Sequence, residues 1–90
     1  MSVKTELAQA LAALEEEYRF WVVESIALER GIDNLEEKIA LHEQEIGPER
    51  AAELRARLNR TRERHTAIEE RIRYVRHQLH NLKMRLNAMP

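Results

Sequence analysis

The sequence predicts an all-α protein, a two-helix antiparallel coiled-coil hairpin that we expect to assemble as a dimer into a four-helix bundle. Three observations support this fold class. The 90 residues include only two Gly and two Pro, and 34% of them are charged, mostly as Glu and Arg, which favours long helices over sheet. Apolar residues make up 43% of the chain and recur at alternating spacings of three and four, the heptad rhythm of a coiled coil. A single Gly-Pro pair divides this rhythm into two halves.

The first predicted helix covers about residues 2–46. Ser2 is a suitable N-cap, because its side chain can accept a hydrogen bond from a free amide group of the first turn. The heptad passes through Gly31 without a slip, so we expect one continuous helix that is at most bent there; the alternative is a break, with Asp33–Glu36 capping a third helix. The a and d residues that we expect to form the seam are Leu14, Tyr18, Trp21, Leu28, Ile32, Leu35 and Ile39.

The tight turn is predicted at residues 47–48. Gly suits the position just after a helix, and Pro suits the first turn of the next one, so Gly47 and Pro48 mark the connection. The second helix then covers about residues 49–87, and the whole chain, residues 1–90, forms a single helical hairpin domain. Its expected seam residues are Leu58, Ile68, Ile72, Val75, Leu79 and Leu82.

The charged residues beside the seam indicate that the two helices pair with each other. Residues 1–47 contain eleven acidic and four basic residues, whereas residues 48–90 contain eleven basic and five acidic ones. With Leu11 and Ala51 as a positions, Glu dominates the e and g positions of the first helix and Arg those of the second, where Glu69 is the only acid. In an antiparallel pair e faces e and g faces g, so acid meets base along the seam. Pairing of two like helices would instead place acid against acid.

Four polar residues interrupt the seam: Ser25, His42, Thr61 and His65. Polar residues at such positions commonly fix the register of a coiled coil. A tight turn allows one register in which Thr61 faces Ile32 and His65 faces Leu28, and a second one displaced by a heptad. In the first register the middle of the hairpin is its weakest part, because two polar residues and a helical Gly meet there.

Several apolar residues lie outside the seam of the first helix, where a helix in water should be polar. We expect them to form an interface with a second copy or with a larger protein, because a hairpin of two helices buries little apolar surface by itself. The predicted interface residues are Phe20, Val22, Val23, Ile26 and Ala27, with Tyr74 of the second helix level with Phe20.

The sequence favours a non-enzymatic protein–protein interaction module that acts as a scaffold, adaptor or inhibitor. It offers no catalytic residues, and we expect no cofactor and no metal site; the chain has no Cys, and the pair His77 and His80 has only Glu70 nearby as a further ligand. The alternative is RNA or DNA binding by the Arg-rich second helix, through Arg60, Arg73, His77 and His80.

The predicted location is the cytoplasm, with no contact to a membrane. Apolar runs such as Phe20–Val23 are far shorter than the roughly 20 residues that span a bilayer. The charged N-terminal segment does not resemble a signal peptide.

Overall fold

The computed structural model describes residues 2–90, and it confirms the all-α prediction. One element, α1 (Val3–Asn87), covers almost all of these residues, and the described chain contains no strand. Within α1 only Gly47 departs from helical backbone angles. No helical stretch among the described residues has the length and apolar character needed to cross a membrane.

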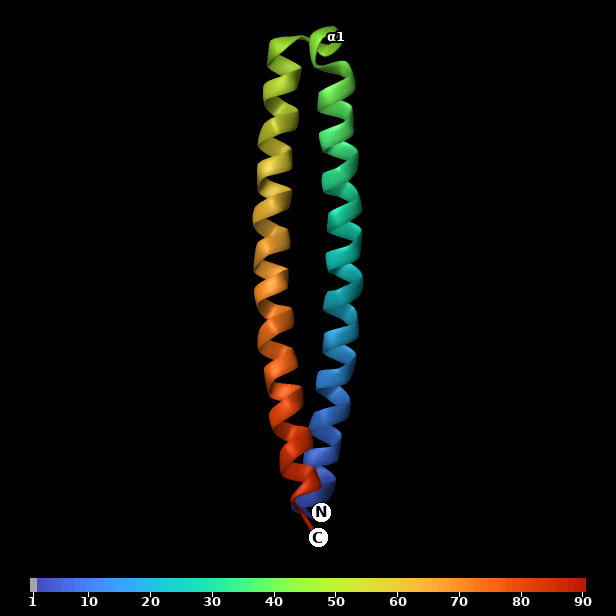
Figure 1. Ribbon diagram of the computed structural model, residues 1–90, viewed down its shortest axis with the longest axis vertical. Helices are drawn as coiled ribbons and strands as arrows, with labels where there is room; N and C mark the ends of the chain where they lie inside the picture. The colour runs from blue at the N-terminus through green and yellow to red at the C-terminus, as the bar shows by residue number, and fades with distance from the viewer. Residues whose placement is uncertain (1) are drawn as a thin grey trace.

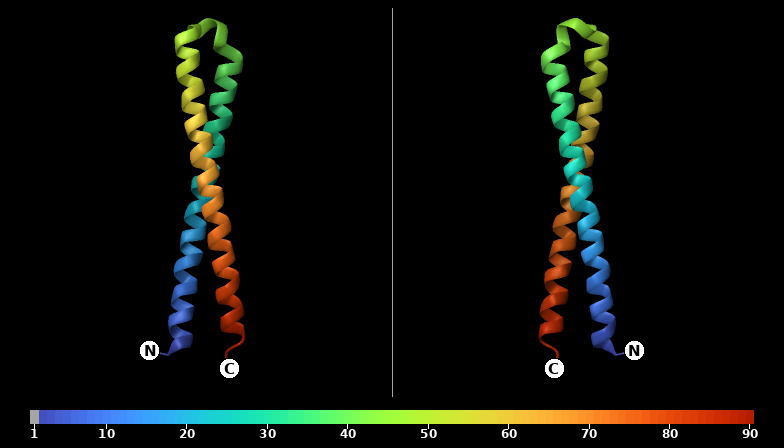
Figure 2. Two further views of the ribbon diagram at one scale, coloured as in Figure 1. Left: turned by 90° about the vertical axis from the view of Figure 1, so that its left-hand side faces the viewer. Right: turned by 90° about the vertical axis from the view of Figure 1, so that its right-hand side faces the viewer.

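The chain reverses its direction at Gly47, so that the two halves of α1 run side by side (Figure 1). We call residues 3–46 the N-terminal arm and residues 48–87 the C-terminal arm. The molecule measures 66 × 17 × 14 Å, whereas an unbroken helix of 85 residues would be about 130 Å long at about 1.5 Å per residue. The arms cross near their middles, and both ends of the chain lie at the end opposite the turn (Figure 2).

The reversal depends on the backbone of two residues. Gly47 has φ 82° and ψ 163°, a combination that only glycine adopts readily because it has no Cβ. Pro48 follows at the start of the C-terminal arm, where its missing amide proton is not needed by the helix. The residue before a proline is also disfavoured in the helical region, so Gly47 and Pro48 together end one arm and begin the next.

The start of α1 agrees with its sequence. Ser2 is the N-cap, and its Oγ accepts a hydrogen bond from the amide of Thr5 at 3.1 Å. Glu6 places a negative charge in the first turn, where it interacts favourably with the helix dipole. The helix continues through Gly31 as predicted, with helical backbone angles on both sides of that residue.

The cross-arm ion pairs fix the register. Glu36 pairs with Arg62 at 2.7 Å and Glu43 pairs with Arg55, and all four residues occupy e positions. On the other flank Arg71 Nε donates to Glu17 Oε1 at 2.8 Å, and both residues occupy g positions. These pairs belong to the register in which Ile32 faces Thr61 and Leu28 faces His65, and they exclude the one displaced by a heptad.

The core is distributed unequally between the two arms. Every buried apolar residue in the described chain lies on the C-terminal arm: Ala51, Leu54, Leu58, Ile68, Ile72, Val75 and Leu79. The expected seam residues of the N-terminal arm, and Leu82 of the C-terminal arm, are only half-buried. Each arm has a single neighbour, and even the large Tyr18 and Trp21 side chains are only half-buried.

The polar seam residues divide into two kinds. Ser25, half-buried His65 and half-buried Thr61 lie within the seam, and the Thr61 hydroxyl donates to the carbonyl of Arg57 at 2.8 Å. His42, in contrast, is exposed and interacts with Glu45 at 3.1 Å. A polar imidazole this close to the turn keeps its hydration and a carboxylate partner instead of entering the core.

Candidate functional site

The large exposed apolar side chains gather on the N-terminal arm. Phe20 is 55% exposed, Val23 is 64% exposed and Ile26 is 44% exposed, and Ala27 is exposed as well. Tyr74 contributes an exposed ring from the C-terminal arm, whereas Val22 is half-buried. The predicted interface residues therefore differ in how much surface they offer to a partner.

These residues lie on two different flanks. Phe20, Val23 and Ala27 follow each other at spacings of three and four, so they form one stripe along the outside of the N-terminal arm on its g side. Val22 and Ile26 line a groove of about 260 Å³ on the e side, together with Glu69 and Arg76 of the C-terminal arm. We call Phe20, Val23, Ala27 and the neighbouring Tyr74 the outer stripe.

A chain of contacts links the outer stripe to the seam. The rings of Phe20 and Trp21 meet edge to face, with their centroids 4.9 Å apart. Trp21 Nε1 donates to Glu17 Oε1 at 3.2 Å, and Arg71 donates to the same oxygen. The guanidinium of Arg71 also lies 5.1 Å from the centre of the Tyr74 ring, a cation–π arrangement. These contacts connect the exposed aromatic side chains of both arms to the seam.

The contacts to Glu17 predict a pH-dependent contribution to stability. Hydrogen bonds from Arg71 and then from Trp21 hold the pKa of Glu17 below its ordinary value of 4.5. A carboxyl with a lowered folded-state pKa stabilises the fold above its unfolded pKa, and this contribution is lost as the pH falls through the folded pKa. We expect Glu17→Gln to lower the free energy of unfolding near neutral pH by about 0.2–1 kcal/mol, a small value because the pair is partly exposed to water.

Urea unfolding followed by circular dichroism checks this prediction. The difference between the wild type and Glu17→Gln should disappear well below pH 4.5, where Glu17 is protonated. Glu16→Gln is the matched control, because Glu16 is exposed on the outside of the same turn. A difference that stays constant across the acid range would show that charge on Glu17 contributes nothing.

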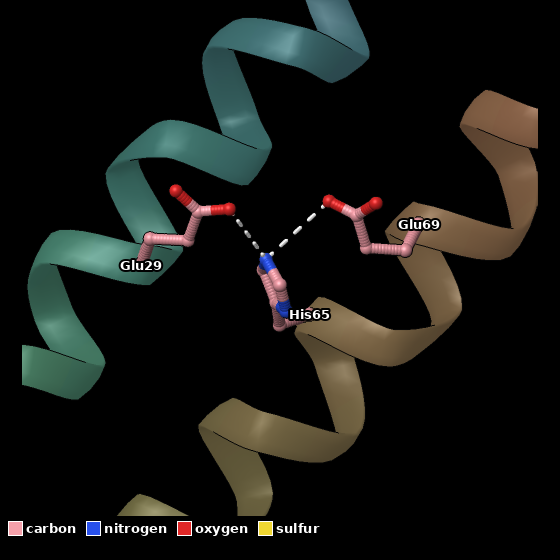
Figure 3. A group of neighbouring side chains, drawn as sticks. All are labelled: Glu29, His65 and Glu69. Atoms are coloured by element: carbon pink, nitrogen blue, oxygen red, sulfur yellow. Dashed lines mark hydrogen bonds and ion pairs between the residues drawn. The ribbon is translucent and has the colours of Figure 1, made fainter.

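A polar cluster occupies the middle of the seam. His65 Nε2 lies 3.2 Å from Glu29 Oε1, 3.5 Å from Glu69 Oε1 and 3.3 Å from Ser25 Oγ. The Ser25 hydroxyl donates to Glu69 Oε1 at 2.6 Å, and Ser25 is the only buried polar residue in the described chain. Figure 3 shows Glu29 reaching His65 from the N-terminal arm, while Glu69 approaches it from the same arm as His65. The sequence showed Ser25 and His65 as polar seam residues, but not that two carboxylates join them.

The predicted nucleic-acid contacts do not form a compact basic site. Arg60, Arg73, His77 and His80 are all exposed, but Arg60 lies about 26 Å or more along the arm from the two His at about 1.5 Å per residue. Three Arg of the C-terminal arm, at positions 55, 62 and 71, are paired with Glu of the other arm. Three of the eleven basic residues of the C-terminal arm are thus used inside the molecule.

The fold defines an elongated, coiled-coil-like helical protein. Comparisons with models of known protein families, with curated proteins and with solved structures find no match to this chain. Its function therefore has to be inferred from its own surface and charge pattern.

Proposed function

We propose that the chain is a non-enzymatic, cytoplasmic protein–protein interaction module, an antiparallel coiled-coil hairpin that pairs with a second copy in a four-helix bundle. The outer stripe of Phe20, Val23, Ala27 and Tyr74 forms the centre of the contact. The observation that carries the proposal is the concentration of large exposed apolar side chains on the N-terminal arm. The seam residues of the same arm are only half-buried by the C-terminal arm.

The energetics of a two-helix molecule support a second layer of helices. Each arm has only one neighbour, and the buried apolar side chains all come from one arm. Full burial of a Phe or Val side chain contributes about 1.5–3 kcal/mol. A two-fold symmetric contact uses each residue twice, so Phe20 and Val23 alone supply a large part of what a stable dimer needs.

The aromatic residues of the outer stripe suit an interface. Phe20 and Tyr74 already contact Trp21 and Arg71, which reduces the side-chain entropy lost when a partner covers them. Aromatic and Arg side chains of this kind are common energetic anchors of protein interfaces. The module would act as a scaffold, adaptor or inhibitor through this surface.

The test is the oligomeric mass of a surface variant. We expect Phe20→Glu combined with Val23→Glu to halve the mass measured by light scattering, because four charges would be buried at the contact of the two copies. Leu41→Glu combined with Met84→Glu is the matched control, since these side chains are 64% and 58% exposed and lie outside the stripe. The control should keep the wild-type mass.

Two results would contradict self-association. The first is a monomeric wild type, and the second is an equal loss of mass in the stripe variant and in the control. The outer stripe would then dock on a larger protein instead. In that case the wild type and the Leu41→Glu, Met84→Glu control should capture the same protein, and the Phe20→Glu, Val23→Glu variant should not. Binding of RNA that weakens steeply with salt would favour the nucleic-acid alternative instead.

A further inference from the structure

We propose that Glu29, His65 and Glu69 bind one divalent transition-metal ion, with Zn²⁺ as the probe, and that this ion links the two arms at their middle. Imidazole nitrogen and carboxylate oxygen are ordinary ligands of Zn²⁺. The three ligand atoms come from both arms and all lie within 4.8 Å of one another (Figure 3). The inference does not depend on the proposed dimer.

The distances from His65 to the two carboxylates suit a tetrahedral ion. Bonds of about 2.0–2.2 Å from Zn²⁺ to nitrogen and oxygen place neighbouring ligands about 3.3–3.5 Å apart in a tetrahedron. His65 Nε2 lies 3.2 Å from Glu29 Oε1 and 3.5 Å from Glu69 Oε1. The two carboxylate oxygens lie within 4.8 Å of each other, so they would have to move closer together for one ion to bind all three ligands.

The acid–base pattern beside the seam is interrupted where Glu29 faces Glu69. At the next two e positions toward the turn an acid faces a base, Glu36 with Arg62 and Glu43 with Arg55. Glu29 instead faces Glu69, the only acid at the e and g positions of the C-terminal arm. Two carboxylates across the same seam repel each other unless a positive charge lies between them, and a bound cation supplies that charge.

A single N–H of His65 cannot donate a hydrogen bond to both carboxylates at once. Its Nε2 carries at most one proton, but it faces two carboxylate oxygens and the Ser25 hydroxyl. A metal ion on the Nε2 lone pair would interact with both carboxylates at once. The Ser25 hydroxyl would keep its hydrogen bond to Glu69 and hold that carboxylate in place, as the outer partners of metal ligands do.

A groove beside the cluster offers an entry path. It is lined by Ser25, Glu29 and Glu69 of the cluster and also by Arg76, and Glu29 is exposed. With three protein ligands, a tetrahedral ion would take water from this groove as its fourth ligand. The site would therefore be accessible and exchangeable.

The test is calorimetric titration of the chelator-treated protein with Zn²⁺, together with thermal unfolding in Zn²⁺ and in chelator. We expect one ion for each chain and a melting temperature that rises with the Zn²⁺ concentration, because an ion that binds only the folded chain stabilises it. Ser25→Ala should weaken binding by about 10–100-fold. The variant with both His77→Ala and His80→Ala should bind like the wild type, which controls for surface His.

The Glu69→Arg variant separates loss of Zn²⁺ binding from loss of folding. This change places a base opposite Glu29, as Arg62 lies opposite Glu36, so we expect a higher melting temperature in chelator and no response to Zn²⁺. His65→Ala should also abolish the response. The proposal is overturned if the wild type binds no Zn²⁺, or if Glu69→Arg or His65→Ala keeps the wild-type affinity.

Discussion

Replacing Gly47 with alanine is expected to destabilise the fold by about 1–3 kcal/mol, the cost of holding a residue with a Cβ in a backbone region that is nearly exclusive to glycine. The backbone of Gly47 has φ 82° and ψ 163°. A Cβ placed there meets no atom within 4 Å, so the whole cost comes from the backbone conformation and none from a clash with neighbours. Urea unfolding followed by circular dichroism measures the loss.

Gly31→Ala is a matched control with the opposite sign. Gly31 lies inside a regular helix, and a Cβ there also meets no atom within 4 Å. Alanine should therefore stabilise the fold by about 0.5–1 kcal/mol, because it loses less backbone entropy than glycine on folding. Equal effects at the two positions would contradict this explanation of the turn.

Small-angle scattering separates loss of stability from opening of the turn. A Gly47→Ala chain that relieves its strain by extending would form one helix of about 130 Å at about 1.5 Å per residue, about twice the 66 Å length of the folded molecule. Two such chains could exchange arms with each other. We expect the variant to keep the length of the wild type, because Pro48 still opposes a continuous helix.

Leu54→Ala is expected to have the largest effect on stability, a loss of about 2–5 kcal/mol, which combines the lost burial with the cavity that remains. Leu54 is only 3% exposed. Leu41→Ala removes the same atoms from a side chain that is 64% exposed, and it should change stability by less than about 0.5 kcal/mol. Urea unfolding of both variants checks the pair, and a similar loss in both would mean that the C-terminal arm does not form the core.

The heptad pattern predicted the helical fold and the rule that acid meets base at the e and g positions. The structure adds which residues pair, such as Glu36 with Arg62 and Glu17 with Arg71, because the sequence left two registers open. The pattern could not predict that the core would lie on one arm. Both arms carry apolar residues at the same a and d spacing, so periodicity alone does not distinguish the arm with buried side chains from the arm with half-buried ones.

The sequence also contained a signal for the polar cluster that was missed. The register that pairs Leu28 with His65 places the next residue, Glu29, opposite Glu69. Considered separately, each residue has an ordinary explanation: Ser25 and His65 as polar seam residues, Glu29 as a flanking acid and Glu69 as a single exception. Only the distances show that the four side chains meet at one layer.

The place of the two chain ends has a practical consequence for experiments. Both ends lie at the same end of a 66 Å rod, opposite Gly47 (Figure 1). A fluorescent label or affinity tag attached to either end would therefore stay far from the turn. Two dyes, one at each end, would report by energy transfer whether the arms stay together or spread apart.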